Sequence, residues 1–206
     1  MNFKGKIDVI FGPMFSGKST ELQRKMKRYL IAEKKCLIIN YAKDNRYSNE
    51  NVVSTHDKQT MKASKFNKLS DADDIVESYE IIGIDEGQFF DDLVEKAEEW
   101  ANMGKVVIIA ALDATFQRKP FNRVCELVAI AENVKKLHSV CNICKKKGSF
   151  TQRVSGDSQI ELVGGVDIYK SVCRKCYYAD EITKQLPNIV STSNLTDISE
   201  ETPVSP

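Results

Sequence analysis

The stretch that most constrains the fold lies near the start of the chain, where an apolar run leads into a loop bracketed by two glycines. Ile7–Phe11 has the pattern of a buried strand, Gly12 and Gly17 permit tight turns, and Lys18 and Ser19 open a helix. In this order, successive backbone N–H groups at a helix N-terminus point toward a polyphosphate. Lys18 would reach the β- and γ-phosphates, and the Ser19 hydroxyl would bind Mg²⁺. A solvent-exposed glycine turn is the alternative, but the flanking strand and helix favour nucleotide binding.

Composition limits the partners and the compartment that we expect. The 206 residues suffice for one ordinary domain with a small appendage, and the apolar fraction of 42% is that of a soluble globular protein. No apolar run approaches the roughly 18 residues that span a bilayer, and the N-terminus lacks a secretory pattern. A net charge of +1 argues against a stable nucleic-acid partner. We therefore expect a cytoplasmic protein with neither a nucleic-acid nor a membrane partner.

Strand and helix patterns alternate along the chain, which predicts an α/β fold with a mostly parallel sheet flanked by helices. The segment 42–69 is polar and weakly periodic, so it is interpreted as a mobile or functional loop with short elements inside it. Further strands are expected at 35–41, 80–86, 105–113 and 135–140, and helices at 18–33, 91–103 and 122–132. The strand at 105–113 is the most apolar and should be central.

Two carboxylates, Asp85 and Glu86, end the strand expected at 80–86. The carboxyl ends of parallel strands gather at one edge of the sheet, where the phosphate loop also lies. Asp85 is therefore the natural second support for Mg²⁺, and Glu86 would project toward the γ-phosphate or the group that attacks it. The alternative is an acidic pair that caps the next helix.

Two aromatic residues, Phe116 and Phe121, flank Arg118 and Lys119 just beyond the strand expected at 105–113. Such a stretch could stack on a flat ring, or it could be a packed loop. Spacing alone leaves the two possibilities equal.

Four of the six cysteines form two C-x-x-C pairs, Cys141 with Cys144 and Cys173 with Cys176. Each pair can clamp one edge of a tetrahedral Zn²⁺, and four thiolates leave no open position, so the metal should be structural. The alternative is a redox pair or a chance spacing. The other two, Cys36 and Cys125, are each expected to be small buried hydrophobes.

The boundaries follow from these patterns. We expect a nucleotide-binding α/β domain at 1–138, a zinc-held β subdomain at 139–180 that projects a loop over the site, and a disordered tail at 187–206. In the subdomain, 150–154 and 159–163 alternate like two strands around a Ser-Gly-Asp-Ser turn. The tail is acidic and rich in Ser, Thr and Pro.

Assembled, these stretches resemble the thymidine kinase family of the cytosolic vertebrate, poxviral and bacterial type, from Lys6 to about Tyr178. The resemblance rests on specific runs together with the two C-x-x-C pairs and Tyr169 ahead of the second: Gly12-Pro13-Met14-Phe15-Ser16-Gly17-Lys18-Ser19, Tyr41-Ala42-Lys43-Asp44-Asn45-Arg46-Tyr47, Asp85-Glu86-Gly87-Gln88-Phe89 and Phe116-Gln117-Arg118-Lys119-Pro120-Phe121.

The resemblance implies a P-loop (RecA-like) fold and transfer of the γ-phosphate of ATP to the 5′-hydroxyl of thymidine. It further implies Mg²⁺, a structural Zn²⁺ in each subunit, a homotetramer and feedback inhibition by thymidine triphosphate. Glu86 would be the catalytic base, and Lys18, Mg²⁺ and either Arg46 or Arg153 would neutralise charge on the transferring group.

Matching positions also imply two binding sets. The phosphate and Mg²⁺ side would comprise Gly12, Pro13, Met14, Phe15, Ser16, Gly17, Lys18, Ser19, Asp44, Asn45, Arg46, Asp85, Glu86, Gly87 and Gln88. The thymidine side would comprise Phe116, Ile160, Glu161, Leu162, Val163, Gly164 and Tyr169, with Leu112, Phe121 and Thr151 lining the base pocket. This implication favours contact with thymine over simple packing for Phe116.

Two rival functions remain open from the residues alone. A nucleic-acid-stimulated ATPase with a zinc ribbon would also place an Asp-Glu pair after a strand, but the near-neutral charge argues against it. A regulatory GTPase would need an Asn-Lys-x-Asp stretch for guanine, and Asn67-Lys68-Leu69-Ser70 fails at its last position.

Overall fold

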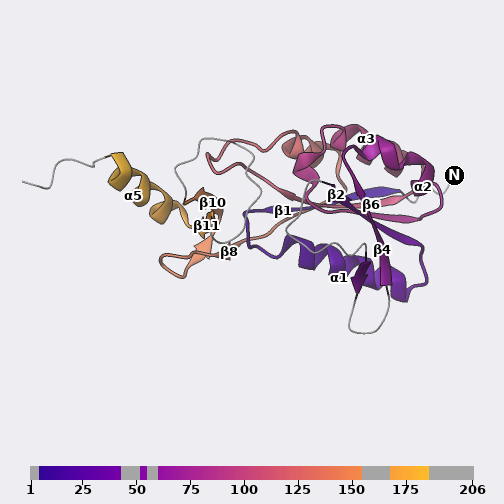
Figure 1. The fold of residues 1–206 in the computed structure, drawn as a ribbon, viewed down its shortest axis with the longest axis horizontal. Helices are drawn as coiled ribbons and strands as arrows, with labels where there is room; N and C mark the ends of the chain where they lie inside the picture. The colour runs from indigo at the N-terminus through magenta and orange to yellow at the C-terminus, as the bar shows by residue number, and fades with distance from the viewer. Residues whose placement is uncertain (1–4, 43–51, 55–59, 155–167, 186–206) are drawn as a thin grey trace, which may run out of the picture.

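The structure is a computed structural model that describes residues 5–42, 52–54, 60–154 and 168–185. A twisted sheet lies between two layers of helices, and a smaller part carrying the cysteines extends from one end (Figure 1). The sheet has the strand order β3-β4-β2-β5-β6-β1-β7. Its strands are β1 Lys6–Gly12, β2 Cys36–Tyr41, β3 Val52–Ser54, β4 Thr60–Phe66, β5 Ile81–Ile84, β6 Val106–Leu112 and β7 Asn133–Lys136. All ladders are parallel except that between β3 and β4, so the predicted α/β fold is confirmed.

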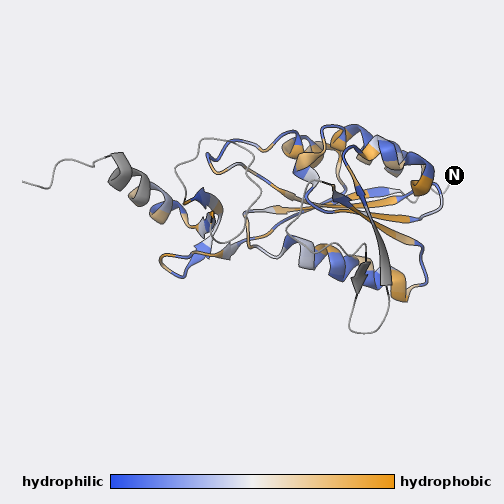
Figure 2. Ribbon diagram, viewed as in Figure 1, coloured by the Kyte–Doolittle hydropathy of each residue, from blue (hydrophilic) through white to orange (hydrophobic). Residues whose placement is uncertain are grey.

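The helices cover both faces of the sheet and bury two apolar clusters. On one face, α1 (Lys18–Ile31) packs Leu22 and Met26 against β1, β2, β5 and β6. The other face carries η1 (Leu69–Ala72), α2 (Asp73–Val76), α3 (Leu93–Asn102), η3 (Val124–Glu126) and α4 (Leu127–Ile130). Hydrophobic residues run along the central strands (Figure 2). As predicted, β6 is central: its neighbours are β5 and β1, and Val107–Ala111 is buried throughout.

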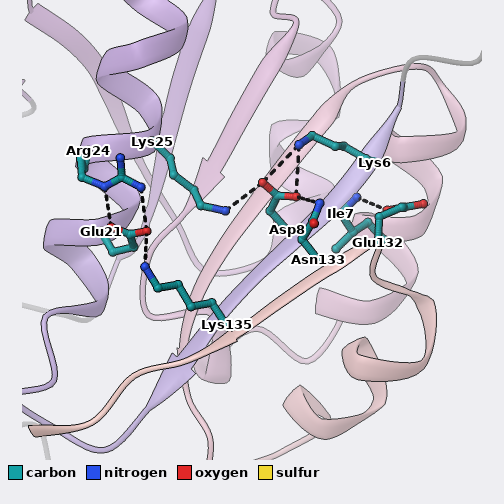
Figure 3. Close-up of polar contacts among 9 residues, drawn as sticks. All are labelled: Lys6, Ile7, Asp8, Glu21, Arg24, Lys25, Glu132, Asn133 and Lys135. Atoms are coloured by element: carbon teal, nitrogen blue, oxygen red, sulfur yellow. Dashed lines mark hydrogen bonds and ion pairs between the residues drawn. The ribbon is translucent and has the colours of Figure 1, made fainter.

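All four residues of the edge strand β7 are exposed, so apolar burial does little to hold the strand in place. Polar contacts hold it to β1 in addition to the ladder. Asp8 of β1 is buried and accepts hydrogen bonds from Asn133 Nδ2 (2.8 Å) and from Lys25 Nζ of α1 (2.9 Å). Glu21 of α1 likewise bridges Arg24 and Lys135 (Figure 3). These contacts tie α1 and β7 to the phosphate-loop strand and to each other.

The part of the chain that carries the two C-x-x-C pairs is called the cysteine module here. It comprises residues 139–154 and 168–185. It contains β8 (Ser139–Val140), β9 (Lys147–Gly148), β10 (Phe150–Arg153), β11 (Tyr169–Val172) and α5 (Arg174–Gln185). Strands β8 and β9 form one small antiparallel ladder, and β10 and β11 form another.

Several elements differ from the sequence-based expectation. Strand β4 lies inside the sheet within the segment interpreted as a loop, and β11 and α5 were not predicted. The helix expected at 122–132 is shorter, because Ala131 turns extended (φ −92°, ψ 136°) to enter β7. The strand expected at 135–140 is two strands, since the ladder of β7 with β1 stops at Lys136 and β8 pairs with β9 instead. The second strand of the expected hairpin, 159–163, lies outside the described residues, as does the tail at 187–206.

The expectation for Cys125 was wrong. Cys36 is buried in the cluster beneath α1, but Cys125 is exposed, since it falls on the outer side of the short η3 turn where Val124 is the buried residue. Within the described ranges, no helix is both long and apolar enough to cross a bilayer.

Candidate functional site

The phosphate loop follows β1 and has the backbone that the two glycines were expected to allow. Gly12 has φ +153°, and a Cβ there would lie 2.5 Å from the Leu137 carbonyl oxygen, so only glycine fits without a shift. Gly17 has φ +81° and precedes α1, whose first turn closes with the Glu21 N–H donating to the Gly17 carbonyl. Phe15 also adopts a positive φ (61°), although it is not glycine. Such strain in a non-glycine residue is typical of ligand-binding backbone.

The interior of this loop suits a phosphate group. Lys18 Nζ donates to the Pro13 carbonyl at 2.9 Å, which holds the ammonium across the loop. The Ser16 hydroxyl oxygen is buried with no hydrogen-bond partner, and no atom lies within 4 Å of where a Gly17 Cβ would be. A buried polar atom without a partner costs free energy unless a ligand or water satisfies it. Together with the dipole of α1, these donors would hold the anion.

Ser19 and Asp85 meet at the carboxyl edge of the sheet, as their predicted roles require. The Ser19 hydroxyl donates to Asp85 Oδ1 at 2.9 Å, although the two residues are 66 positions apart. Burial and the neighbouring Glu86 charge raise the pKa of Asp85 to about 6. A carboxylate that is costly to ionise gains most from a nearby cation. This hydroxyl and carboxylate are therefore a fitting pair of ligands for Mg²⁺.

Glu86 follows Asp85 and is oriented by a buried glutamine. Its backbone is left-handed (φ 54°), and Gln88 Nε2 donates to Glu86 Oε2 at 2.5 Å. Gln88 is 1% exposed, and its Oε1 accepts from the Leu112 N–H at 2.8 Å. The end of β6 thus fixes the side chain of Gln88, which in turn holds the carboxylate of Glu86. A strained backbone and a locked rotamer together point to a preorganised functional group.

Two aromatic groups stand on the loops that follow β5 and β6. Phe89 stacks on Tyr41 (ring centroids 5.1 Å apart) and meets Phe121 edge to face at 5.7 Å. Neither Phe89 nor Tyr41 was among the predicted site residues, because a Phe within an apolar stretch is usually a core residue.

The second group joins Phe116 to the cysteine module. The guanidinium of Arg153 lies 4.0 Å from the centre of the Phe116 ring and donates to the Tyr169 hydroxyl at 2.6 Å. Phe116 therefore has a cation on one face, and the same guanidinium contacts Tyr169. Arg153 is 3% exposed.

Thr151 lies against the phosphate loop, and so does Ser171, its cross-strand partner. The Met14 N–H donates to Thr151 Oγ1 at 3.0 Å, and Ser171 Oγ donates to the Met14 carbonyl at 2.5 Å. Both backbone polar groups of Met14 are thus occupied by the cysteine module. Ser171 was not predicted, since one serine in a strand carries no recognisable sequence signal.

The four predicted metal ligands come together as a cluster. The sulfur atoms of Cys141, Cys144, Cys173 and Cys176 all lie within 4.8 Å of one another, with 3.6 Å between Cys144 and Cys173. A Zn–S bond of about 2.3 Å gives tetrahedral S–S edges of about 3.8 Å, so the set fits zinc. Burial opposes ionisation of Cys141, yet backbone N–H groups of Cys144, Cys173 and Ile143 bring its pKa down to about 6.

Comparison with known proteins identifies the family. A sequence model described as thymidine kinase matches residues 5–177. The chain belongs to the thymidine kinase family. It is 55% identical to the thymidine kinase of Myxoma virus (strain Uriarra) over 85% of this chain and 98% of that protein. It is 54% identical to thymidine kinase 1 of Dictyostelium discoideum over 86% of this chain and 79% of that protein. The Variola virus thymidine kinase is 53% identical over 84% of this chain and 97% of that protein.

The family confirms the resemblance found in the sequence: this chain is a kinase that phosphorylates thymidine. Family membership also implies use of ATP, and the cysteine cluster supports a zinc site. Some predicted site residues, Asp44, Asn45 and Arg46 on the phosphate side and 160–164 on the thymidine side, lie outside the described residues.

Proposed function

We propose that the kinase transfers the γ-phosphate of Mg-ATP to the 5′-hydroxyl of thymidine at the carboxyl edge of the sheet, with Glu86 as the general base. The observation that carries this proposal is the meeting of Ser19 with Asp85 (2.9 Å) directly beside Glu86, whose carboxylate is held by Gln88. The groups that would bind phosphate, the groups that would bind Mg²⁺ and a fixed carboxylate thus all lie at the carboxyl edge of the sheet. Phosphoryl transfer needs positioning and charge neutralisation more than covalent help.

The residues divide into a donor side and an acceptor side. On the donor side, the backbone N–H groups from Phe15 onward and Lys18 would bind the phosphates, while the Met14 N–H is already engaged by Thr151. Ser19 and Asp85 would hold Mg²⁺, which neutralises phosphate charge when bound. The remaining predicted residues of this side keep the roles that the family resemblance implies.

On the acceptor side, Phe116, Tyr169, Leu112 and Phe121 would surround thymine, and we add Phe89 on the strength of its contact with Phe121. Thr151 would border the base while it binds the Met14 N–H. Glu86 would accept the proton of the 5′-hydroxyl as that oxygen attacks the γ-phosphate. Arg153, bonded to Tyr169 and stacked on Phe116, supports this side rather than the phosphates.

The cysteine cluster would hold one structural Zn²⁺, because its four thiolates leave no open position for a substrate. We further propose the division into a nucleotide-binding domain at 1–138 and a zinc subdomain at 139–180. A cytoplasmic homotetramer inhibited by thymidine triphosphate completes the proposal. Light scattering of the purified enzyme and inhibition by thymidine triphosphate at varied thymidine concentration test these last points.

The test of the chemistry is Glu86→Gln. This variant keeps the shape and the contact with Gln88 but cannot accept a proton, so turnover should fall by about 10²- to 10⁴-fold with thymidine binding retained. Glu80→Gln is the matched control, since Glu80 lies exposed at the opposite end of β5, paired with Lys34. ADP production with thymidine measures both. Near-normal turnover in Glu86→Gln would reject Glu86 as the base.

A further inference from the structure

We propose that Ser171 and Tyr177 are positioning residues through which the cysteine module holds two loops separately: Ser171 holds the phosphate-donor loop and Tyr177 holds the Phe116 loop. The inference rests on the assignment of donor and acceptor sides made above. The module would then position both substrate-binding loops.

The donor connection runs through a single residue, Met14. Ser171 is 0% exposed, and its hydroxyl donates to the Met14 carbonyl at 2.5 Å. Its cross-strand partner Thr151, 6% exposed, accepts from the Met14 N–H at 3.0 Å. Two hydroxyls on neighbouring strands therefore hold the peptide units on both sides of the Met14 Cα. The Met14 carbonyl shares its peptide plane with the Phe15 N–H, so rotation of that plane would redirect the first of the N–H groups that would bind phosphate.

Ser171 is itself fixed by the first cysteine pair. Asn142 lies between Cys141 and Cys144, and its Oδ1 accepts from the Ser171 N–H at 3.0 Å. The Asn142 N–H in turn donates to the Ser171 carbonyl at 2.8 Å. The backbone of Ser171 is thus hydrogen-bonded to the segment that would wrap the metal. Its side chain takes no part in these bonds and is left to bind Met14.

The acceptor connection comes from a different element. Tyr177, on α5 directly after Cys176, is 4% exposed, and its hydroxyl donates to the Phe116 carbonyl at 2.8 Å. Arg118 follows Phe116 by two positions in the same loop. Its guanidinium lies 4.6 Å from the centre of the Tyr177 ring and 4.5 Å from that of Tyr178. A carbonyl bond and a cation on aromatic rings together hold the Phe116 loop against α5.

The two connections share no residue: the donor connection leaves the module from β10 and β11, and the acceptor connection leaves it from α5. Removal of one hydroxyl should therefore disturb one substrate and spare the other. A residue with a purely structural role would instead affect both substrates together, through loss of folded enzyme.

The experiment compares Ser171→Ala and Tyr177→Phe in the zinc-loaded full chain. Calorimetric binding of a non-hydrolysable ATP analogue and of thymidine is measured, together with the KM of each substrate and the zinc content. Ser171→Ala should weaken the ATP analogue by about 3- to 10-fold and leave thymidine within about 2-fold, the effect expected for one buried hydrogen bond. Tyr177→Phe should show the reverse pattern.

Two further variants separate positioning from folding. Ser171→Thr restores a hydroxyl and should recover most of the ATP affinity. Ser139→Ala is the matched control, because Ser139 is also a buried serine of the module whose hydroxyl meets a carbonyl, that of Gly148 at 3.3 Å. It should change neither substrate's affinity.

Equal weakening of both substrates by either variant, or unchanged binding in both, would overturn the proposal. A Lys18→Ala variant checks the underlying assignment independently. If ATP-analogue affinity is unchanged in Lys18→Ala, the donor side itself has been misplaced, whereas a loss there with no effect of Ser171→Ala rejects only the positioning role.

Discussion

The main sheet and the cysteine module reach a fixed shape by different means. Among the described residues, the sheet buries apolar clusters of twenty and eight side chains on its two faces. The module's cluster has three: Cys141, Val172 and Tyr177. A core of that size supplies little of the hydrophobic free energy that ordering a chain requires, and the proposed zinc would supply the rest.

The two halves of the site therefore depend on different forces. The carboxylates and the phosphate loop stand on strands fixed by apolar packing. The other half of the site stands on strands β10 and β11 and on helix α5, which the cysteine cluster fixes; its residues are Thr151, Tyr169, Ser171 and Tyr177. Conditions that act on one force should leave the other half of the site in place.

The largest effect is expected from removal of the metal. Chelation should unfold the module and reduce thymidine phosphorylation by more than about 10²-fold, because the binding free energy of a structural zinc is folding free energy. Amide hydrogen exchange of 139–154 and 168–180, compared with that of β6, measures it. Protection of the module that survives loss of zinc would contradict the comparison.

The next effect is that of core truncation. Ile109→Ala in β6 should lower the free energy of unfolding by about 2–5 kcal/mol, as expected for a fully buried aliphatic side chain. Val172→Ala, also fully buried, should chiefly speed exchange within the loaded module. Urea unfolding of both variants gives the contrast. Equal losses of global stability would show that the two parts fold as one unit.

A smaller effect of opposite sign is expected at Asp85. Its pKa is raised by burial and by Glu86 from 3.8 to about 6, so the stability linked to its protonated form is complete below about pH 3.8 and lost as the pH rises through about 6. In zinc-loaded enzyme without Mg²⁺ at pH 8, Asp85→Asn should therefore raise the free energy of unfolding by about 1–3 kcal/mol, and with Mg²⁺ and both substrates present it should abolish activity.

The measurement is denaturant unfolding of both proteins at pH 8 and pH 4. The gain should disappear at pH 4, and a gain of equal size at both values would show that ionisation is not its cause.

The smallest effect is expected at Gly17. Gly17→Ala meets no neighbouring atom, so it should cost only the strain of φ +81°, about 1 kcal/mol. Gly12→Ala is the contrast, because its methyl would approach the Leu137 carbonyl, in the link between β7 and the module. Thermal unfolding compares them. A larger loss in Gly17→Ala than in Gly12→Ala would contradict this account.

The parts of the site that the sequence predicted are those with a local signal. Strand β1 with its loop, and Asp85 with Glu86 after β5, combine an apolar run with residues whose chemistry is distinctive. The C-x-x-C spacing predicted the cysteine cluster in the same way. The family resemblance supplied the roles that no local pattern shows.

What could not be predicted depends on partners far along the chain. Strand β4 contains two lysines and a serine, and only its ladder with β2 makes it part of the sheet. Strand β11 likewise exists through pairing with β10. The Ser171–Met14 bond joins residues 157 positions apart, so nothing near either residue announces it.

One feature of the sheet carries a practical consequence for spectroscopy. Trp100, the single tryptophan of the chain, is 1% exposed on α3, where its Nε1 donates to Asp73 at 3.0 Å. The module has tyrosines instead. Tryptophan emission therefore reports the environment of the sheet alone, and a fluorescence melt would record an intact protein after the module had already opened.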